Sequence, residues 1–128
     1  MCSSDLGRAH LLTAAADLDP SARVPWYGPS MSARSCLTAR LMETWAHGQD
    51  VADALGVERA ATTRLRHVAH IAVRARPYSY RVRGLEVPQT GVSVVLRAPD
   101  GASWEWESGD ERIEGSADRK STRLNSSH

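Results

Sequence analysis

The stretch Ala39-Arg-Leu-Met-Glu-Thr-Trp-Ala-His-Gly-Gln-Asp-Val-Ala-Asp-Ala-Leu-Gly56 decides the fold of this chain. It lies within a longer segment, Ser30–Leu55, whose apolar residues recur at helical spacing. Ser30 or Ser32 can cap the first turn of a helix there, and Gly56 can end the helix in the left-handed conformation. The segment therefore predicts one continuous helix.

This helix has two faces of different character. One face carries the large apolar residues and reads Leu37, Leu41, Trp45, Gly48, Ala52 and Leu55. The opposite face is polar and small, and reads Ala39, Glu43, Ala46, His47, Asp50 and Ala54. A face meant only for packing would carry Leu or Ile, so the second face is expected to stay open.

Glu43 and His47 are the candidate metal ligands. They are four residues apart, so their side chains leave one side of the helix, within about 6 Å of each other. Carboxylate oxygen and imidazole nitrogen are good ligands for zinc and other divalent metals. Asp50, one turn after His47, can orient the second ring nitrogen or bind a water in the site.

Another interpretation of this pair stays open. Glu–His pairs at this spacing also occur on solvated helices, and a catalytic zinc usually has three protein ligands. His67 and His70 are the local candidates for a third ligand, although their spacing equally fits a helix that pairs with carboxylates or contacts a loop. Cys36 lies on a different face and is expected to be a small core residue rather than a nucleophile.

The segments before and after this helix predict further helices. Gly7–Leu18 has the composition of the end of a helix, which Asp19-Pro20 stops. Pro20–Pro29 is expected to be a loop in which Trp26 and Tyr27 anchor the chain on a core. A third helix is predicted from about Arg59 to Arg74.

Near Arg76-Pro77 the period of the pattern changes from 3.6 to 2, which predicts strands for the rest of the chain. The expected strands are Tyr78–Arg83, Val92–Arg97, Trp104–Glu107 and Asp110–Gly115. Pro99-Asp100-Gly101 has the composition of a hairpin turn. Trp104 and Trp106 alternate with acidic residues, which predicts the buried face of a strand. Arg74, Arg76, Arg81 and Arg83 favour a solvated surface over an anion site.

Both ends of the chain look foreign to the natural protein. The last eleven residues, DRKSTRLNSSH, are what one frame of a common sequencing adapter encodes, and the first six, MCSSDL, fit the same adapter read from the other strand. We therefore expect residues 1–6 and 118–128 to pack against nothing. The remaining residues, 7–117, would start inside a helix and stop within the strands, so a part of the natural protein would be missing on each side.

Composition excludes several classes of protein. The formal net charge is +1, and residues 7–117 contain 13 Arg and no Lys against 13 acidic residues. Near-neutrality argues against a nucleic-acid-binding surface. No apolar run approaches the roughly 20 residues that span a bilayer, so no membrane partner is expected. A single thiol between the two foreign ends, Cys36, favours a reducing cytoplasm.

From Trp26-Tyr-Gly-Pro-Ser-Met-Ser through the Glu43–His47 helix to His67-Val-Ala-His-Ile-Ala-Val-Arg and Pro77-Tyr-Ser-Tyr, the chain resembles a known family. It is similar to the DinB-like metal-binding proteins related to mycothiol-dependent maleylpyruvate isomerase. The resemblance implies an α+β protein: the C-terminal part of a DinB-like helical bundle, residues 7–76, followed by the start of a small sterol-carrier-like α+β domain with antiparallel strands, residues 77–117.

The resemblance also implies a cofactor and a function. The family's metal is typically zinc, held by a His of an early helix and by a Glu and His that match Glu43 and His47. The early His has no counterpart here, so the third ligand is expected upstream, and this chain should bind zinc weakly. In an isomerase the metal would activate the thiol of mycothiol, which would add to the cis double bond of a small dicarboxylate substrate. The alternative is a non-catalytic metal-binding or small-ligand-binding protein.

Overall fold

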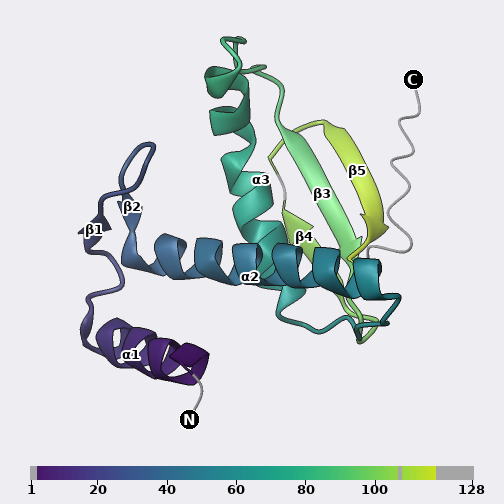
Figure 1. The fold of residues 1–128 in the computed structure, drawn as a ribbon. Coiled ribbons are helices and arrows are strands. Elements are labelled where there is room, and N and C mark those ends of the chain that lie inside the picture. Colours follow the sequence, from purple (N-terminus) through teal and green to yellow (C-terminus); the bar gives the residue numbers. More distant parts are fainter. Residues whose placement is uncertain (1–2, 107, 118–128) are drawn as a thin grey trace. The chain divides into compact units, whose positions relative to one another are not determined.

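The computed structural model describes residues 3–106 and 108–117, which form an α+β protein with three helices and two small sheets (Figure 1). The elements follow one another as α1 (Ser3–Asp17), β1 (Arg23–Val24), β2 (Met31–Ser32), α2 (Ala33–Leu55), α3 (Leu65–Val82), β3 (Val92–Arg97), β4 (Ser103–Trp106) and β5 (Glu111–Ser116). The chain divides into two compact units, Met1–Trp45 and Ala46–His128. The predicted α+β class is confirmed.

In the first unit, β1 and β2 form an antiparallel pair that pairs Arg23 with Ser32 and Val24 with Met31. The Arg23 guanidinium donates to the hydroxyl oxygen of Ser30 and so closes the hairpin. Trp26 and Tyr27 lie in the hairpin loop, edge to face with ring centroids 5.7 Å apart. Trp26 is 41% exposed and Tyr27 fully exposed. The prediction that they anchor the loop on a core is therefore wrong, because the hairpin carries both rings into solvent.

The expectation that residues 1–6 and 118–128 pack against nothing can be compared with only a few described residues. α1 begins at Ser3, so the first turn of this helix belongs to the segment expected to be foreign. Asp5 and Leu6 are both exposed, as is nearly all of α1. Residues 1–2 and 118–128 lie outside the described part of the chain.

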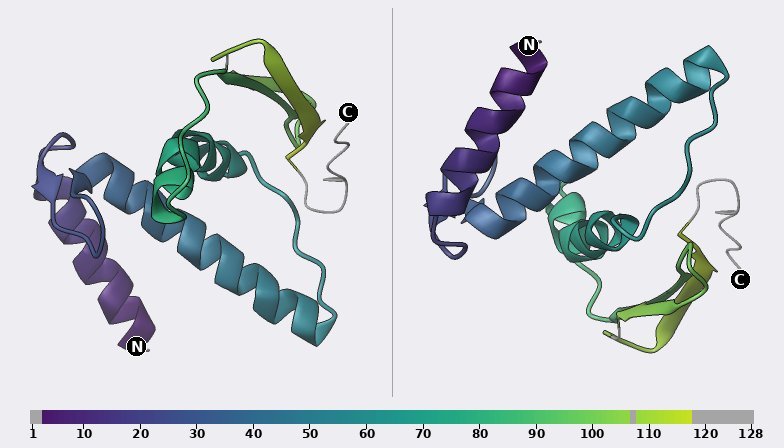
Figure 2. Two further views of the ribbon diagram at one scale, coloured as in Figure 1. Left: turned by 90° about the horizontal axis from the view of Figure 1, so that it is seen from above. Right: turned by 90° about the horizontal axis from the view of Figure 1, so that it is seen from below.

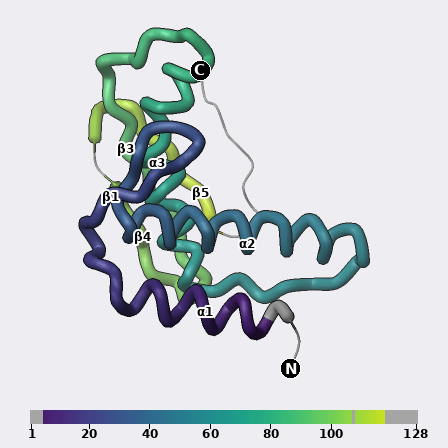
Figure 3. Tube along the Cα trace, turned by 60° about the vertical axis from the view of Figure 1, so that its left-hand side comes forward, coloured from purple at the N-terminus to yellow at the C-terminus, as the bar shows by residue number. Residues whose placement is uncertain are grey.

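α2 agrees with the sequence prediction, apart from its start at Ala33 instead of Ser30. The Ser32 hydroxyl accepts the backbone N–H of Ser35 at 3.1 Å and thereby caps the first turn. Gly56 has a φ of 65°, and the N–H groups of Gly56 and Val57 donate back to the last turn. This pair of bonds is the Schellman arrangement that ends many helices at a glycine. Figure 3 shows α2 as one unbroken helix.

α3 differs from its prediction at both ends. It begins at Leu65 instead of Arg59, and it continues through Pro77 to Val82, so the predicted strand Tyr78–Arg83 is wrong. Pro77 removes one backbone donor but does not stop the helix. The stop comes at Gly84, with a φ of 68°, where N–H groups donate back to Arg81 and Tyr80 as they do at the end of α2. The boundary expected after residue 76 thus falls inside α3.

The three-stranded sheet has the order β4-β3-β5 (Figure 2). β3 and β4 form the predicted antiparallel hairpin, closed at Pro99-Asp100-Gly101 by the Ala98 N–H, which donates to the Ala102 carbonyl at 2.7 Å. β5 also forms where a strand was expected, but it pairs with β3 in parallel. The expected purely antiparallel arrangement is corrected to a mixed sheet, because the chain crosses the start of β3 before β5 begins.

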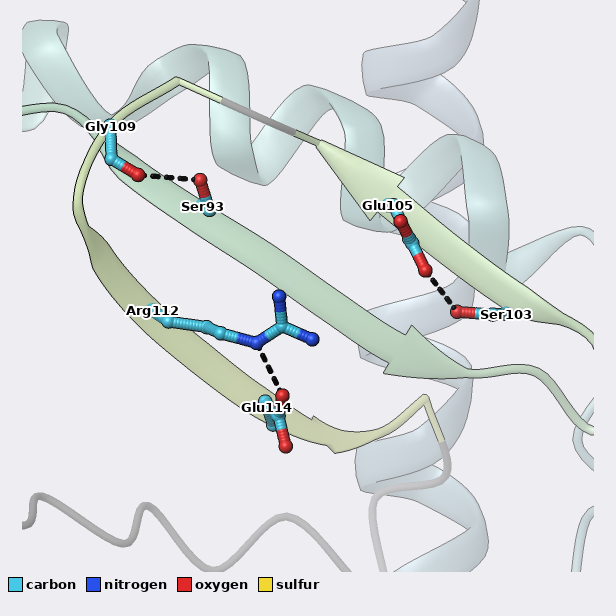
Figure 4. A network of polar contacts seen from close by, with 6 residues as sticks. All are labelled: Ser93, Ser103, Glu105, Gly109, Arg112 and Glu114. Carbon is cyan, nitrogen blue, oxygen red and sulfur yellow. Dashed lines mark hydrogen bonds and ion pairs between the residues drawn. The ribbon is translucent and has the colours of Figure 1, made fainter.

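This crossing requires glycine on both sides. A Cβ atom at Gly91 would overlap the backbone of Ser108, and one at Gly109 would overlap the backbone of Gly91. Ser93 donates its hydroxyl to the Gly109 carbonyl at 2.7 Å (Figure 4). Ser108 donates its own hydroxyl to the Val92 carbonyl, also at 2.7 Å. Two serine hydroxyls therefore hold the crossing where two glycines make room for it.

The described core is small. Its buried apolar residues are Ala33, Ala39, Ala52, Leu65, Val92, Ala98 and Trp104. Trp104 is buried and Trp106 half-buried, while Glu105 between them is exposed, which confirms the predicted buried face of the strand. Large apolar side chains remain exposed on each of the three described helices. Among the described residues, no helix is long and apolar enough to cross a membrane.

Candidate metal centre

Glu43 and His47 lie on the same unbroken helix. α2 runs from Ala33 to Leu55 without interruption, so the four-residue spacing puts both side chains on one side of it. The caps at Ser32 and Gly56 hold its two ends, each more than two turns from the pair. The helical setting predicted for the two candidate ligands is therefore present.

The pair is accessible rather than enclosed. Glu43 is half-buried, and both His47 and Asp50 are exposed. Each of the three has a polar or electrostatic interaction within the structure, so none is an isolated charge. Exposure matters for chemistry, because a metal ion and a small ligand can approach His47 without opening a core. Exposure by itself gives no argument for ligation, since an exposed imidazole needs no partner to offset burial.

No third ligand joins the pair in the described part of the chain. Among residues 3–106 and 108–117, no group of three or more His, Cys, Asp or Glu side chains is arranged to hold a metal ion. Two ligands leave a divalent metal mostly solvated and bind it weakly. A complete site would need a donor from elsewhere.

The structure gives His70 a different role. Its Nδ1 accepts a hydrogen bond from the Trp106 Nε1–H at 3.1 Å, and the two ring centroids are 6.4 Å apart. His70 thus links α3 to β4, and one of its two nitrogens is already occupied. His67, one turn earlier on α3, is exposed. The expected alternatives to ligation were pairing with carboxylates or contact with a loop, and His70 instead contacts a tryptophan of a strand.

One further contact, between Gly48 and Arg59, was missed by sequence reasoning. Gly48 lies on α2 beneath the side chain of Arg59, and a Cβ at this glycine would come within 2.9 Å of Arg59 Nη1. The signal was present, because glycine inside a long helix costs about 1 kcal/mol and indicates close approach of another group. Cys36 is half-buried, and the structure describes it as a free thiol, in keeping with a packing role.

Comparison with known proteins identifies the first part of the chain. Residues 5–52 match the family described as the mycothiol maleylpyruvate isomerase N-terminal domain, and this range contains Glu43 and His47. The resemblance expected from the sequence is confirmed over these residues. No solved structure matches the chain.

Two longer relatives extend the match. Both are uncharacterized proteins of Mycobacterium tuberculosis, from two strains, and each is 54% identical over 98 residues. The match covers 75% of this chain and 38% of each relative. The chain therefore spans less than half the length of the curated relatives it matches.

Proposed function

We propose that this chain is part of a metal-binding, mycothiol-linked protein similar to maleylpyruvate isomerase, in which Glu43 and His47 hold a divalent metal, with zinc as the first candidate. The observation that carries the proposal is the match of residues 5–52 to the isomerase N-terminal domain, which includes both ligands. In this proposal α1 and α2 belong to a DinB-like helical bundle, α3 leads out of it, and β3–β5 begin a sterol-carrier-like domain.

The side chains of Glu43 and His47 are of the chemical types that bind such a metal. A carboxylate and an imidazole are the ligand types that zinc accepts, and α2 fixes their spacing. Asp50 follows His47 by three residues and is the candidate to orient its ring. The third ligand would come from the remainder of the longer protein, because the described residues hold no group of three donors.

The proposed chemistry is activation of a thiol. A bound zinc lowers the pKa of a coordinated thiol, so that thiolate is present at neutral pH. This chain's contribution would be to hold the metal through Glu43 and His47 and to leave its solvent side open, since His47 is exposed. The partners would be the thiol cofactor mycothiol and a small-molecule substrate, and the place of action the cytoplasm. The absence of three clustered donors from the described residues keeps a non-catalytic metal-binding protein as the second candidate.

Zinc titration by calorimetry tests the ligands. This chain should bind zinc weakly and the longer mycobacterial relative firmly, and His47→Ala or Glu43→Gln, made at the aligned positions of the relative, should abolish binding. His67→Ala is the matched control and should change nothing. Firm, stoichiometric binding to this chain that depends on His47 alone would contradict the missing third ligand. Loss of binding in His67→Ala or His70→Ala would place that ligand on α3.

Mycothiol then separates the two candidate functions. Added to the zinc-loaded relative at constant pH, it should release a proton on binding, because the thiol binds the metal as thiolate. Release should disappear with His47→Ala at the aligned position. Firm zinc binding without proton release would favour the non-catalytic protein.

A further inference from the structure

An apolar seam runs along α3. Its residues are Val68, Ile71, Ala75, Tyr78 and Val82, spaced alternately three and four apart. This is the seven-residue repeat with which one helix packs lengthwise against another. Val68 and Ile71 are half-buried, but Tyr78 is 46% exposed and Val82 65% exposed. The C-terminal half of the seam is therefore uncovered.

A basic border accompanies the seam. His67, Arg74 and Arg81 are seven residues apart, each directly precedes one seam residue, and all three are exposed. The helix Leu65–Val82 contains no Asp or Glu, and the nearest acidic residues are Glu58 and Glu86. Within the described part of the chain, neither Arg74 nor Arg81 forms an ion pair. In paired helices this flanking position faces charges of the partner and selects it.

The seam is distinct from the side of α3 that contacts its own unit. Leu65 is buried, and His70 accepts the hydrogen bond of Trp106 on β4. None of these residues belongs to the seam. Within the described residues, the C-terminal half of the seam, with Tyr78 and Val82, is therefore the part left uncovered.

The pattern favours an acidic helix over other occupants. Against a second antiparallel α3, Arg74 and Arg81 would face arginines, which repel. A lipid surface takes a broad face of large apolar side chains, whereas this seam is one residue wide and has Ala75 at its middle, where two helix backbones can approach. We infer that the α3 seam docks an amphipathic partner helix whose apolar seam is bordered by Asp or Glu.

Two synthetic peptides test this inference. Each would be a helix of about 21 residues with the same Leu and Ile seam, bordered by Glu in one and by Lys in the other. Fluorescence anisotropy should show the Glu peptide binding this chain about tenfold more tightly at low salt, with the difference shrinking as salt screens the charges. Arg74→Glu combined with Arg81→Glu should reverse the preference. Arg97→Glu, an exposed arginine of β3, is the matched control and should leave it unchanged.

Other outcomes would overturn the inference. Equal binding of both peptides would remove the charge selection, and binding only to vesicles of anionic lipid would assign the surface to membranes. If the variant with Arg74→Glu and Arg81→Glu lost helix content, Arg74→Gln with Arg81→Gln would replace it. That variant should abolish the salt dependence of the preference for the Glu peptide. Tyr78→Ser should weaken both peptides, because the ring lies in the uncovered half of the seam. None of these measurements involves zinc, so they stand or fall apart from the proposed metal site.

Discussion

α2 and α3 end in the same way, but the sequence signals that predict the two ends differ. Both stop at a glycine with positive φ, Gly56 and Gly84, and both return two N–H groups to the last turn. In α2 the apolar spacing, the Ser32 cap and the glycine all indicate the same helix. In α3 a proline and an alternating Tyr-Ser-Tyr run suggest a strand just where the helix continues. A helix boundary is thus better predicted from its closing glycine than from an internal proline.

The beginnings of the two helices differ as well. At α2, the Ala33 N–H donates to the Ala22 carbonyl, the Arg34 N–H to the Pro20 carbonyl and the Ser35 N–H to the Ser32 hydroxyl. At α3, the residue in the cap position, Arg64, makes no capping bond through its side chain. At the start of α3 the N–H groups of Leu65, Arg66 and His67 donate to the backbone carbonyls of Thr62, Thr63 and Arg64. Of the two helices, only α2 begins with a side-chain cap, and this cap is the signal from which its start was predicted within three residues.

The largest expected effect on stability comes from a proline introduced inside α2, as Pro77 already lies inside α3. Thr44→Pro would remove the N–H of an exposed helical residue and press the ring on the carbonyl of Arg40, at a cost of about 3 kcal/mol in the free energy of unfolding. Urea unfolding followed by circular dichroism would measure it. Thr44→Ala is the control and should change stability little. Equal results for the two variants would mean that α2 is not a continuous helix around Glu43.

The reverse change in α3 should have a smaller effect of opposite sign. Pro77→Ala restores the missing backbone donor inside the helix and should stabilise the chain by about 2 kcal/mol. Thermal unfolding would show a higher midpoint and more helical signal. A loss of stability instead would show that Pro77 is needed for the path of α3. Pro99→Ala, in the hairpin turn, is the comparison and should not stabilise.

The two closing glycines should prove equivalent. Gly56→Ala and Gly84→Ala each force a Cβ into the left-handed conformation and should each cost about 1 kcal/mol. Gly7→Ala is the matched control with opposite sign, since Gly7 lies inside α1 in open space. Unequal costs at 56 and 84, measured by denaturant unfolding, would contradict the shared geometry of the two helix ends.

The smallest expected effect is on the stability of the chain at acidic pH. Hydrogen bonds from the backbone N–H and the hydroxyl of Ser21 hold the pKa of Asp19 below its ordinary value of 3.8. The ionised carboxylate therefore stabilises the turn that supplies carbonyls to the start of α2. This contribution is present above the unfolded pKa and is lost as pH falls through the lower folded pKa. Asp19→Asn should flatten the pH dependence of stability in that acidic range without altering α3.

Much of the fold followed from local patterns, and the failures had physical causes. α2, the Pro99–Gly101 hairpin and the buried face of Trp104 were predicted because cap, turn and periodicity agree at each. The parallel pairing of β5 could not be predicted, because it depends on the backbone contact between Gly91 and Gly109, which are far apart in sequence. Tyr27 was misplaced because an aromatic residue suggests burial, whereas a hairpin loop can expose it.

The candidate site was predictable in part only. Spacing alone places Glu43 and His47 on one side of a helix, and the structure provides that helix. Whether they bind metal depends on a donor distant in the sequence, which no local pattern can reveal. The role of His70 was likewise beyond the pattern, since its partner Trp106 comes 36 residues later.

The crossing at Gly91 also predicts the order in which β3, β4 and β5 pair during folding. β3 and β4 are joined by a short turn, and hairpins of this kind form within microseconds. β5 can pair with β3 only once the chain has been laid across the start of β3, so we expect the parallel strand to join last. Until then the outer edge of β3 would present unpaired N–H and C=O groups that a strand from another chain could occupy. The two glycines are therefore needed for β5 to cover this edge, because a side chain at either position would block the crossing.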